Sequence, residues 1–254
     1  MTDTAVYRPG PRSWAELLVC EAKMVIRDTA GLVVPIALPM IILVMNASSA
    51  GRAVVAPGRT ALDVYVLPLV FTMVLATTGI VNTPSFLAYY RTSGILRRLA
   101  MTPASPAMVL VAQLAVGVLQ VSVGIAAAWT LAALAFGAKP PPNVGAAIGV
   151  LALAALAMYA TGMVVAALAP TPNSAVAIGL ILFFAVGALG GMFGDRGSLP
   201  DALAAIGDRL PFGAAVQALS AVWSGGAVEP AQLLPLLVSV VCGVVIASIF
   251  FRWE

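Results

Sequence analysis

Long apolar segments alternate with short polar breaks along most of this 254-residue chain. Each segment is close to the roughly 20 mostly apolar residues that a helix needs to cross a hydrocarbon core about 30 Å thick. A transmembrane barrel would instead alternate apolar and polar residues over short segments, and the sequence does not do this. The pattern therefore predicts an all-α polytopic membrane protein. Its six expected spans lie at about residues 31–50, 62–88, 106–136, 144–169, 174–193 and 231–251.

The first 30 residues come before these spans and predict a tail followed by a surface helix. Ser13 is expected to cap a helix from Trp14 to Asp28. In projection, one side of this helix is charged, with Glu16, Lys23 and Arg27. The other side is apolar, with Trp14, Leu18, Ala22, Val25 and Ile26. This pattern is typical of a helix in the membrane interface, although a soluble amphipathic helix is an alternative.

The segment from Gly194 to Gly226 is too often interrupted by proline and charge to cross the membrane. Ser198 and Asp201 form a start signal for one short helix, and Pro211 begins a second. We expect residues 198–224 to form a re-entrant helical hairpin on the outer side, before the last span. Residues 31–254 then form a single six-helix transmembrane domain.

Charge predicts how the chain is oriented. With the N-terminus inside, eight of the 13 Lys and Arg lie on the cytoplasmic side, which favours cytoplasmic termini and a plasma (inner) membrane location. Charged residues stand where a signal peptide would need an apolar core, so we expect the N-terminal segment to be retained. The basic residues are too scattered for a nucleic-acid-binding face, so we expect no nucleic acid partner.

Several kinds of chemistry have no candidate residues. The sequence contains no GxxxxGK[ST] loop and no histidine, so an ATPase site is not expected. No predicted span carries a central charged residue of the kind that ion-coupled carriers use. We expect the serines within the spans, Ser122, Ser239 and Ser248, to bond to their own backbone, and Cys20 and Cys242 to stay unpaired. The chain is therefore not expected to be an enzyme or to bind a metal or cofactor.

Polar side chains within the spans are hydroxyls and amides. The candidates for lining a substrate path are Thr77, Thr78, Gln113 and Gln120. The alternative is that they hydrogen-bond neighbouring helices. A path made of such groups suits a large amphipathic or apolar substrate better than an ion.

The segment from Tyr89 to Pro106 reads YYRTSGILRRLAMTPASP and separates the second and third predicted spans. Arg91, Arg97 and Arg98 lie within eight residues here, in a chain with only 13 Lys and Arg. Guanidinium groups bind carboxylates well, and Leu96 and Leu99 add an apolar knob. The segment is thus the best candidate for contact with a soluble partner.

The same segment resembles the signature of the ABC type-2 permease family, the membrane subunits of a class of bacterial ABC exporters. That signature is roughly E-x-G-[TI]-L-x-R-L-x-x-T-P. The matching residues are Gly94, Ile95, Leu96, Arg98, Leu99, Thr102 and Pro103. The acidic residue expected before the glycine is missing, because the chain reads Arg91-Thr92-Ser93. The resemblance is closest to the drug and antibiotic efflux branch.

The resemblance implies that residues 91–103 are a coupling helix that docks on a cytoplasmic ATPase subunit, with Arg91 and Arg97 joining the matched residues. It also implies two such ATPase subunits, which hold the ATP and Mg, and a second permease subunit, either identical or paralogous. The expected function is export of a drug, antibiotic or lipid-like compound from or through the membrane lipid. An ATP-independent carrier or channel, or a membrane scaffold without transport, are the alternatives.

Overall fold

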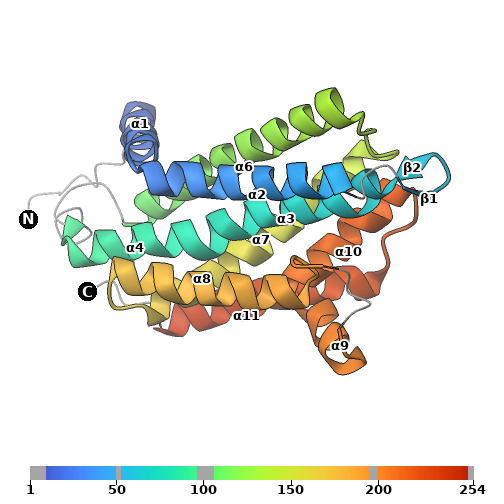
Figure 1. The fold of residues 1–254 in the computed structure, drawn as a ribbon. Helices are drawn as coiled ribbons and strands as arrows, with labels where there is room; N and C mark the ends of the chain where they lie inside the picture. Colours follow the sequence, from blue (N-terminus) through green and yellow to red (C-terminus); the bar gives the residue numbers. More distant parts are fainter. Residues whose placement is uncertain (1–9, 50–52, 96–105, 195–198, 251–254) are drawn as a thin grey trace, which may run out of the picture.

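The computed structural model describes residues 10–49, 53–95, 106–194 and 199–250. Within these residues, six helices are long and apolar enough to cross a membrane, which confirms the predicted all-α polytopic fold. They lie side by side in one elongated bundle (Figure 1). The six are α2 (Thr29–Ser49), a composite helix (Leu62–Thr92), α6 (Pro106–Phe136), α7 (Val144–Leu168), α8 (Pro172–Leu189) and α11 (Pro230–Phe250).

The predicted bounds are close to the observed ones, with two differences. The second span continues to Thr92, four residues past the predicted end. The fifth ends at Leu189 rather than near 193, because the chain turns at Gly190 and Gly191, where Gly191 has a φ of 90°.

The composite helix is the centre of the bundle. It consists of a π-helical turn η1 (Leu62–Val66), α3 (Leu67–Ala76), a second π-helical turn η2 (Thr77–Asn82) and α4 (Thr83–Thr92). In its most apolar window 89% of the residues are buried, compared with 17% in α11. Gly79 in η2 lies so close to α7 that any side chain at Gly162 would overlap the Gly79 carbonyl oxygen. A movement of the composite helix would therefore displace its neighbours directly.

A freed carbonyl group ties three helices together. Pro35 lies inside α2 and has no N–H, so the carbonyl oxygen of Gly31 loses its usual helical partner. Asn82 donates its side-chain amide to this oxygen, and Gln120 donates to it at 2.7 Å. The proline in α2 thus creates an acceptor that η2 and α6 both satisfy.

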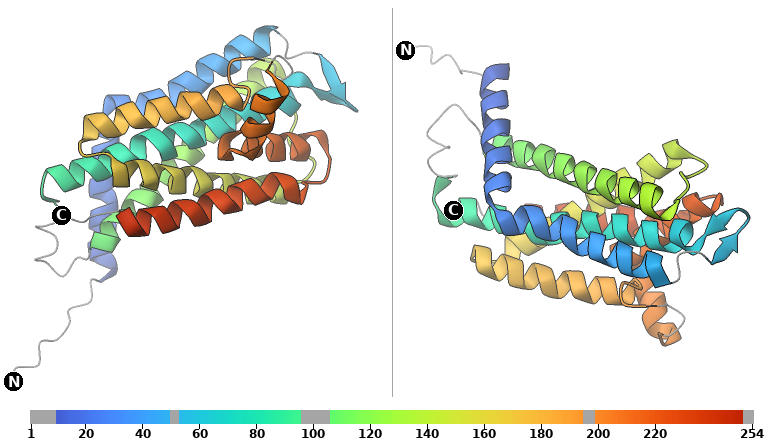
Figure 2. Two further views of the ribbon diagram at one scale, coloured as in Figure 1. Left: turned by 90° about the horizontal axis from the view of Figure 1, so that it is seen from below. Right: turned by 45° about the horizontal axis from the view of Figure 1, so that its top comes forward.

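Helix α1 (Pro11–Arg27) lies across one end of the bundle, nearly at right angles to the spans (Figure 2), and packs on α6 and α2. The prediction that Ser13 caps this helix is wrong: the helix begins at Pro11, with Gly10 as its N-cap and no side-chain cap bond. Proline suits the first helical turn because its missing N–H has no partner there anyway. The charged residues Glu16, Lys23 and Arg27 are all exposed, as expected for an interfacial helix.

The opposite end of the bundle carries a small hairpin in the break between the first two spans. Strands β1 (Val54–Ala56) and β2 (Arg59–Thr60) pair antiparallel around Gly58, which has a φ of 71°. The buried carboxylate of Asp63 accepts hydrogen bonds from the backbone of Thr60 at 3.0 Å and of Lys139 at 2.8 Å. Two loops far apart in the sequence are therefore held to the same point.

Two short helices precede the last span, as predicted. Helix α9 (Asp201–Arg209) begins directly after Pro200 without a side-chain cap, and Ser198 lies outside the described residues. Helix α10 (Pro211–Ser224) is deeply buried against α3, α7 and α11. That this pair re-enters the membrane stays a prediction.

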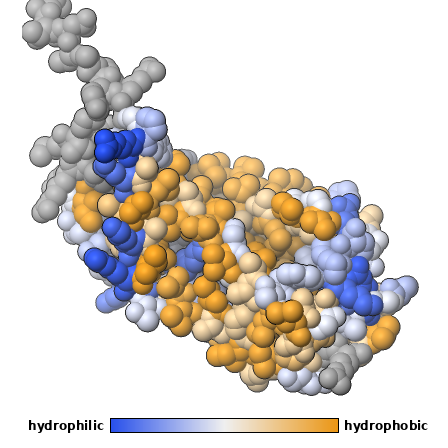
Figure 3. Space-filling model, turned by 90° about the horizontal axis from the view of Figure 1, so that it is seen from above, coloured by the Kyte–Doolittle hydropathy of each residue, from blue (hydrophilic) through white to orange (hydrophobic). Residues whose placement is uncertain are grey.

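The surface supports a membrane location. A broad apolar band separates the two more polar ends of the molecule (Figure 3). In the spans α6 and α11, Ser122, Ser239 and Ser248 each donate to a carbonyl group three or four residues earlier, which confirms their predicted structural role. Cys20 and Cys242 are both free and exposed.

Candidate functional site

The end of α4 is the place where the central helix leaves the bundle. The backbone N–H of Ser93 bonds to Tyr89 at 2.9 Å, and that of Gly94 to Arg91 at 3.3 Å. Gly94 then takes a left-handed conformation with a φ of 69°, which a residue without Cβ adopts readily. The glycine of the family-like segment thus has a structural reason: its left-handed conformation ends α4.

Tyr90 connects this last helical turn to α1. Its hydroxyl donates a 2.5 Å hydrogen bond to Oε2 of Glu21, and both side chains are buried, at 4% and 5% exposure. Burial raises the pKa of the Glu21 carboxyl above its ordinary value, while the hydrogen bond from Tyr90 lowers it by a smaller amount. A carboxyl group in such a place is costly to ionise, so its bond to Tyr90 matters for the position of α1.

Arg91 connects the same turn to α7. Its guanidinium donates to the carbonyl oxygen of Ala166 at 3.3 Å and also to that of Ala169. These carbonyls lie at the C-terminus of α7, where the backbone has unpaired acceptors and a partial negative charge. Arg91 was expected to face an ATPase subunit, but its N–H groups donate to carbonyl acceptors of the membrane domain itself.

An apolar cluster completes the site. Tyr90 and Val109, at the start of α6, form its buried core, and Leu17, Met24 and Ile95 pack against them. We call Glu21, Tyr90, Arg91, Gly94 and Ile95 the α4 hub. Through it, α1, α4, α6 and α7 meet at the start of the predicted coupling segment, residues 91–103.

The remaining residues of the predicted coupling segment cannot be placed. Of that set, Arg91, Gly94 and Ile95 belong to the described part of the chain. The others lie outside the described residues: Leu96, Arg97, Arg98, Leu99, Thr102 and Pro103. Their role in docking stays a prediction.

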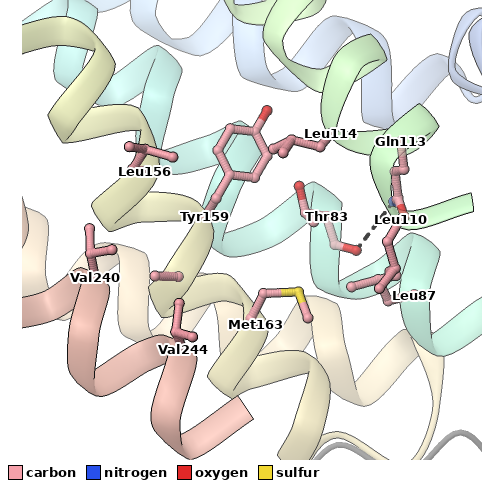
Figure 4. A pocket seen from close by; sticks show the side chains of 11 residues that line it. Thr83, Leu87, Leu110, Gln113, Leu114, Leu156, Tyr159, Met163, Val240 and Val244 are labelled. Atoms are coloured by element: carbon pink, nitrogen blue, oxygen red, sulfur yellow. Dashed lines mark hydrogen bonds between the residues drawn. The ribbon is translucent and has the colours of Figure 1, made fainter. Parts of the chain in front are cut away.

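The four predicted path residues are all buried, but the structure does not gather them around one cavity. Thr77 donates to the carbonyl oxygen of Met73 at 2.8 Å, and Gln120 donates to Gly31 as described above. The hydroxyl of Thr78 is buried without a hydrogen-bond partner. Of the four, Gln113 lines a groove between α4, α6, α7 and α11 (Figure 4). Thr77 therefore bonds within its own helix and Gln120 bonds to a neighbouring one. A path role for the four residues stays a prediction.

Glu21 and Tyr90 were not identified from the sequence. A signal existed, because Glu21 falls four residues after Leu17 and three before Met24, on the stripe that packs against the bundle. The predicted apolar side was centred differently, and Ile26, one of its members, is 64% exposed. An acidic residue inside an apolar stripe is the pattern that could have revealed the pair.

The bundle, its apolar band and the crosswise helix at one end define a multi-pass membrane protein. The model of the ABC-2 type transporter family matches residues 13–223, so the chain belongs to this family. It is the transmembrane, permease component of an ABC transporter, which works with an ABC ATPase and typically with a second permease. The comparison with curated proteins gave no match.

Proposed function

We propose that this permease exports a hydrophobic or amphipathic compound, such as a drug, an antibiotic or a lipid, and that its α1 end faces the cytoplasm. Two ATPase subunits would bind there through residues 91–103 and supply the energy from MgATP. The pore would form with a second copy or a paralogue. No bound cofactor is required of this chain.

The observation that carries the proposal is the path from the predicted docking segment into the core. The most buried helix of the bundle, Leu62–Thr92, runs directly into that segment through Gly94. Its last turn is bonded to α1 by Tyr90 and to α7 by Arg91. A force that reaches the last turn of α4 would thus be passed directly to α1 and α7.

Co-purification with a co-expressed candidate ATPase subunit tests the docking step. We expect the double variant Arg97→Glu, Arg98→Glu to lower recovery of the ATPase by about tenfold or more, because charge reversal repels carboxylates that the arginines would bind. Arg209→Glu is the matched control, since Arg209 is exposed at the opposite end of the bundle. Equal recovery from both variants would contradict the proposed docking segment.

Transport by the reconstituted complex tests the direction and the energy source. In inside-out vesicles, a panel of fluorescent hydrophobic dyes should accumulate only when MgATP is added. Accumulation that needs no ATP and collapses with a proton ionophore would point to an ATP-independent carrier instead. Loss of dye from the vesicle interior on adding ATP would contradict export.

A further inference from the structure

The composite helix Leu62–Thr92 has two halves that lie end to end (Figure 1) but pack against different helices. The half nearer the hairpin, α3, packs chiefly on α2, α6 and α10. The half nearer α1, α4, packs chiefly on α7 and α8. The π-helical turn η2 joins the two halves. A change in the angle at η2 would therefore move one group of helices relative to the other.

Hydrogen bonds anchor both far ends of the composite helix. At the hairpin end, the buried carboxylate of Asp63 accepts from the backbone N–H of Lys139 at 2.8 Å, in the loop between α6 and α7. The same loop accepts a 2.6 Å bond from Arg59 at the carbonyl oxygen of Pro140. At the other end, Arg91 donates to the last turn of α7. Because both ends are held, a bend has to arise between them.

Helical hydrogen bonding is incomplete at η2. The backbone N–H of Thr83 bonds to the carbonyl oxygen of Thr78, and the Thr83 hydroxyl donates to the same oxygen at 2.9 Å. The carbonyl of Gly79 would accept from Thr83 in an α-helical register and from Pro84 in a π-helical one. It receives a bond from neither, because Thr83 is used by Thr78 and proline has no N–H. Fewer bonds therefore resist bending here than in a regular helix.

A buried hydroxyl in the same turn is also unsatisfied. Thr78 is 1% exposed, and its side-chain oxygen has no hydrogen-bond partner. Such groups are rare in folded proteins, and each calls for an explanation, one of which is a segment that stores strain. The missing bonds of η2 are thus found in both its backbone and its side chains.

Neighbouring helices touch η2 through glycine rather than through interlocking side chains. A Cβ on Gly162 of α7 would overlap the Gly79 carbonyl oxygen, and a Cβ on Gly179 of α8 would lie 2.6 Å from that of Ile80. Small residues at such positions let helix backbones approach closely. Displacement is smallest at a pivot, so these close contacts are compatible with a bend that grows along α4.

A second π-helical turn in the same helix offers an internal control. Pro68 follows η1 in the first turn of α3, just as Pro84 follows η2 in the first turn of α4. Both prolines are buried. However, η1 contains Asp63, whose bonds hold it to the loop between α6 and α7. The two turns thus share a local pattern but differ in how they are anchored.

We propose that η2 is the hinge of this permease, at which α4 bends while α3 stays fixed to the hairpin end. The inference rests on the proposed docking of ATPase subunits at residues 91–103 and adds to it the point where the helix yields. Sharp helix bends occur at proline and at π-helical turns, and both are present here. Helix α4 has 10 residues and a length of about 15 Å, so a bend of about 20° moves its far end by about 5 Å.

Distances between spin labels test the bend in complexes that hold one labelled permease copy and the ATPase subunits. One pair of labels lies near α1 and the other near the hairpin, on exposed positions of α2 and the composite helix. The pairs are Val33→Cys with Tyr89→Cys and Met45→Cys with Tyr65→Cys, in a Cys20→Ala, Cys242→Ala background. A non-hydrolysable ATP analogue should change the first distance by about 3 Å or more and leave the second unchanged. Equal changes in both pairs, or none, would overturn the hinge.

Restoring the missing N–H tests the hinge through transport. Pro84→Ala should lower ATP-dependent dye export about fivefold, because the new donor can bond to a free carbonyl of η2 and must be released at each bend. Recovery of the ATPase and thermal stability should not fall. Pro68→Ala, the matched control, should export like the wild type. Equal export by the two variants would contradict the hinge, and the label distances decide the matter if Pro84→Ala does not fold.

The two measurements separate the hinge from the proposed function. If the wild type exports no dye with MgATP but the label distance near α1 responds to the analogue, the export function is wrong and the hinge stands. If the wild type exports dye while that distance stays fixed, export is correct and the hinge is wrong.

Discussion

The hydroxyl of Tyr90 donates a 2.5 Å hydrogen bond to Oε2 of Glu21, across 69 residues of sequence and between two elements of different kinds. One is the crosswise helix α1, and the other is the last turn of the central helix. Because both side chains are buried, neither can exchange this partner for water without moving its helix. The position of α1 is therefore linked to the position of the segment that follows Gly94.

Removal of the Tyr90 hydroxyl should loosen this link. We expect Tyr90→Phe to destabilise the protein by about 1–3 kcal/mol, because the Glu21 carboxyl group is then left buried without a partner. Thermal unfolding of the purified protein measures the effect. The double variant Glu21→Leu, Tyr90→Phe should recover most of the loss, since it removes both polar groups. A Tyr90→Phe protein as stable as the wild type would show that the bond is unimportant.

Docking of α1 should depend on pH through Glu21. The folded pKa of this carboxyl is raised above its ordinary 4.5, so the folded state binds the proton more tightly than the unfolded state. Its contribution is fully present below about pH 4.5 and is lost as the pH rises through the raised value. A spin label on Cys20, in a Cys242→Ala background, should become more mobile over that range. Glu21→Gln should remove the pH dependence, and a dependence that survives would have another origin.

Gly94 can be compared with Gly58, a second glycine with the same left-handed backbone conformation. Gly94 and Gly58 have φ values of 69° and 71°, and a Cβ added to either would meet nothing within 4 Å. Alanine at each position should cost about 1–2 kcal/mol, through the left-handed conformation alone. Only Gly94→Ala should also reduce recovery of the ATPase, because it redirects the coupling segment. Equal recovery from both variants would mean that the turn at Gly94 does not position that segment.

Pro35 and Gln120 should behave as a coupled pair. Gln120→Leu leaves the freed Gly31 carbonyl with one donor fewer and should cost about 1 kcal/mol. In a Pro35→Ala background the restored N–H can bond to that carbonyl, so the same change should cost less. Thermal unfolding of the four proteins of the double-mutant cycle gives the coupling directly. Additive effects would contradict the role assigned to the proline.

The spans could be predicted because hydropathy follows from composition over about 20 residues. Span three was predicted at 106–136 and is observed at Pro106–Phe136. The α4 hub could be predicted only in part. Gly94 is visible in a local motif, but the bond from Arg91 to α7 joins residues 75 positions apart, and the sequence alone does not bring them together. The burial of Glu21 likewise depends on the packing of α1.

The π-helical turn at Thr77–Asn82 fixes the rotational phase of everything that follows it. Such a turn holds an extra residue, and one residue corresponds to about 100° of rotation around a regular helix of 3.6 residues per turn. Without it, Tyr90 would point away from α1 and Arg91 away from α7. The two bonds of the hub thus depend on an irregularity some ten residues upstream, within the most buried of the six spans.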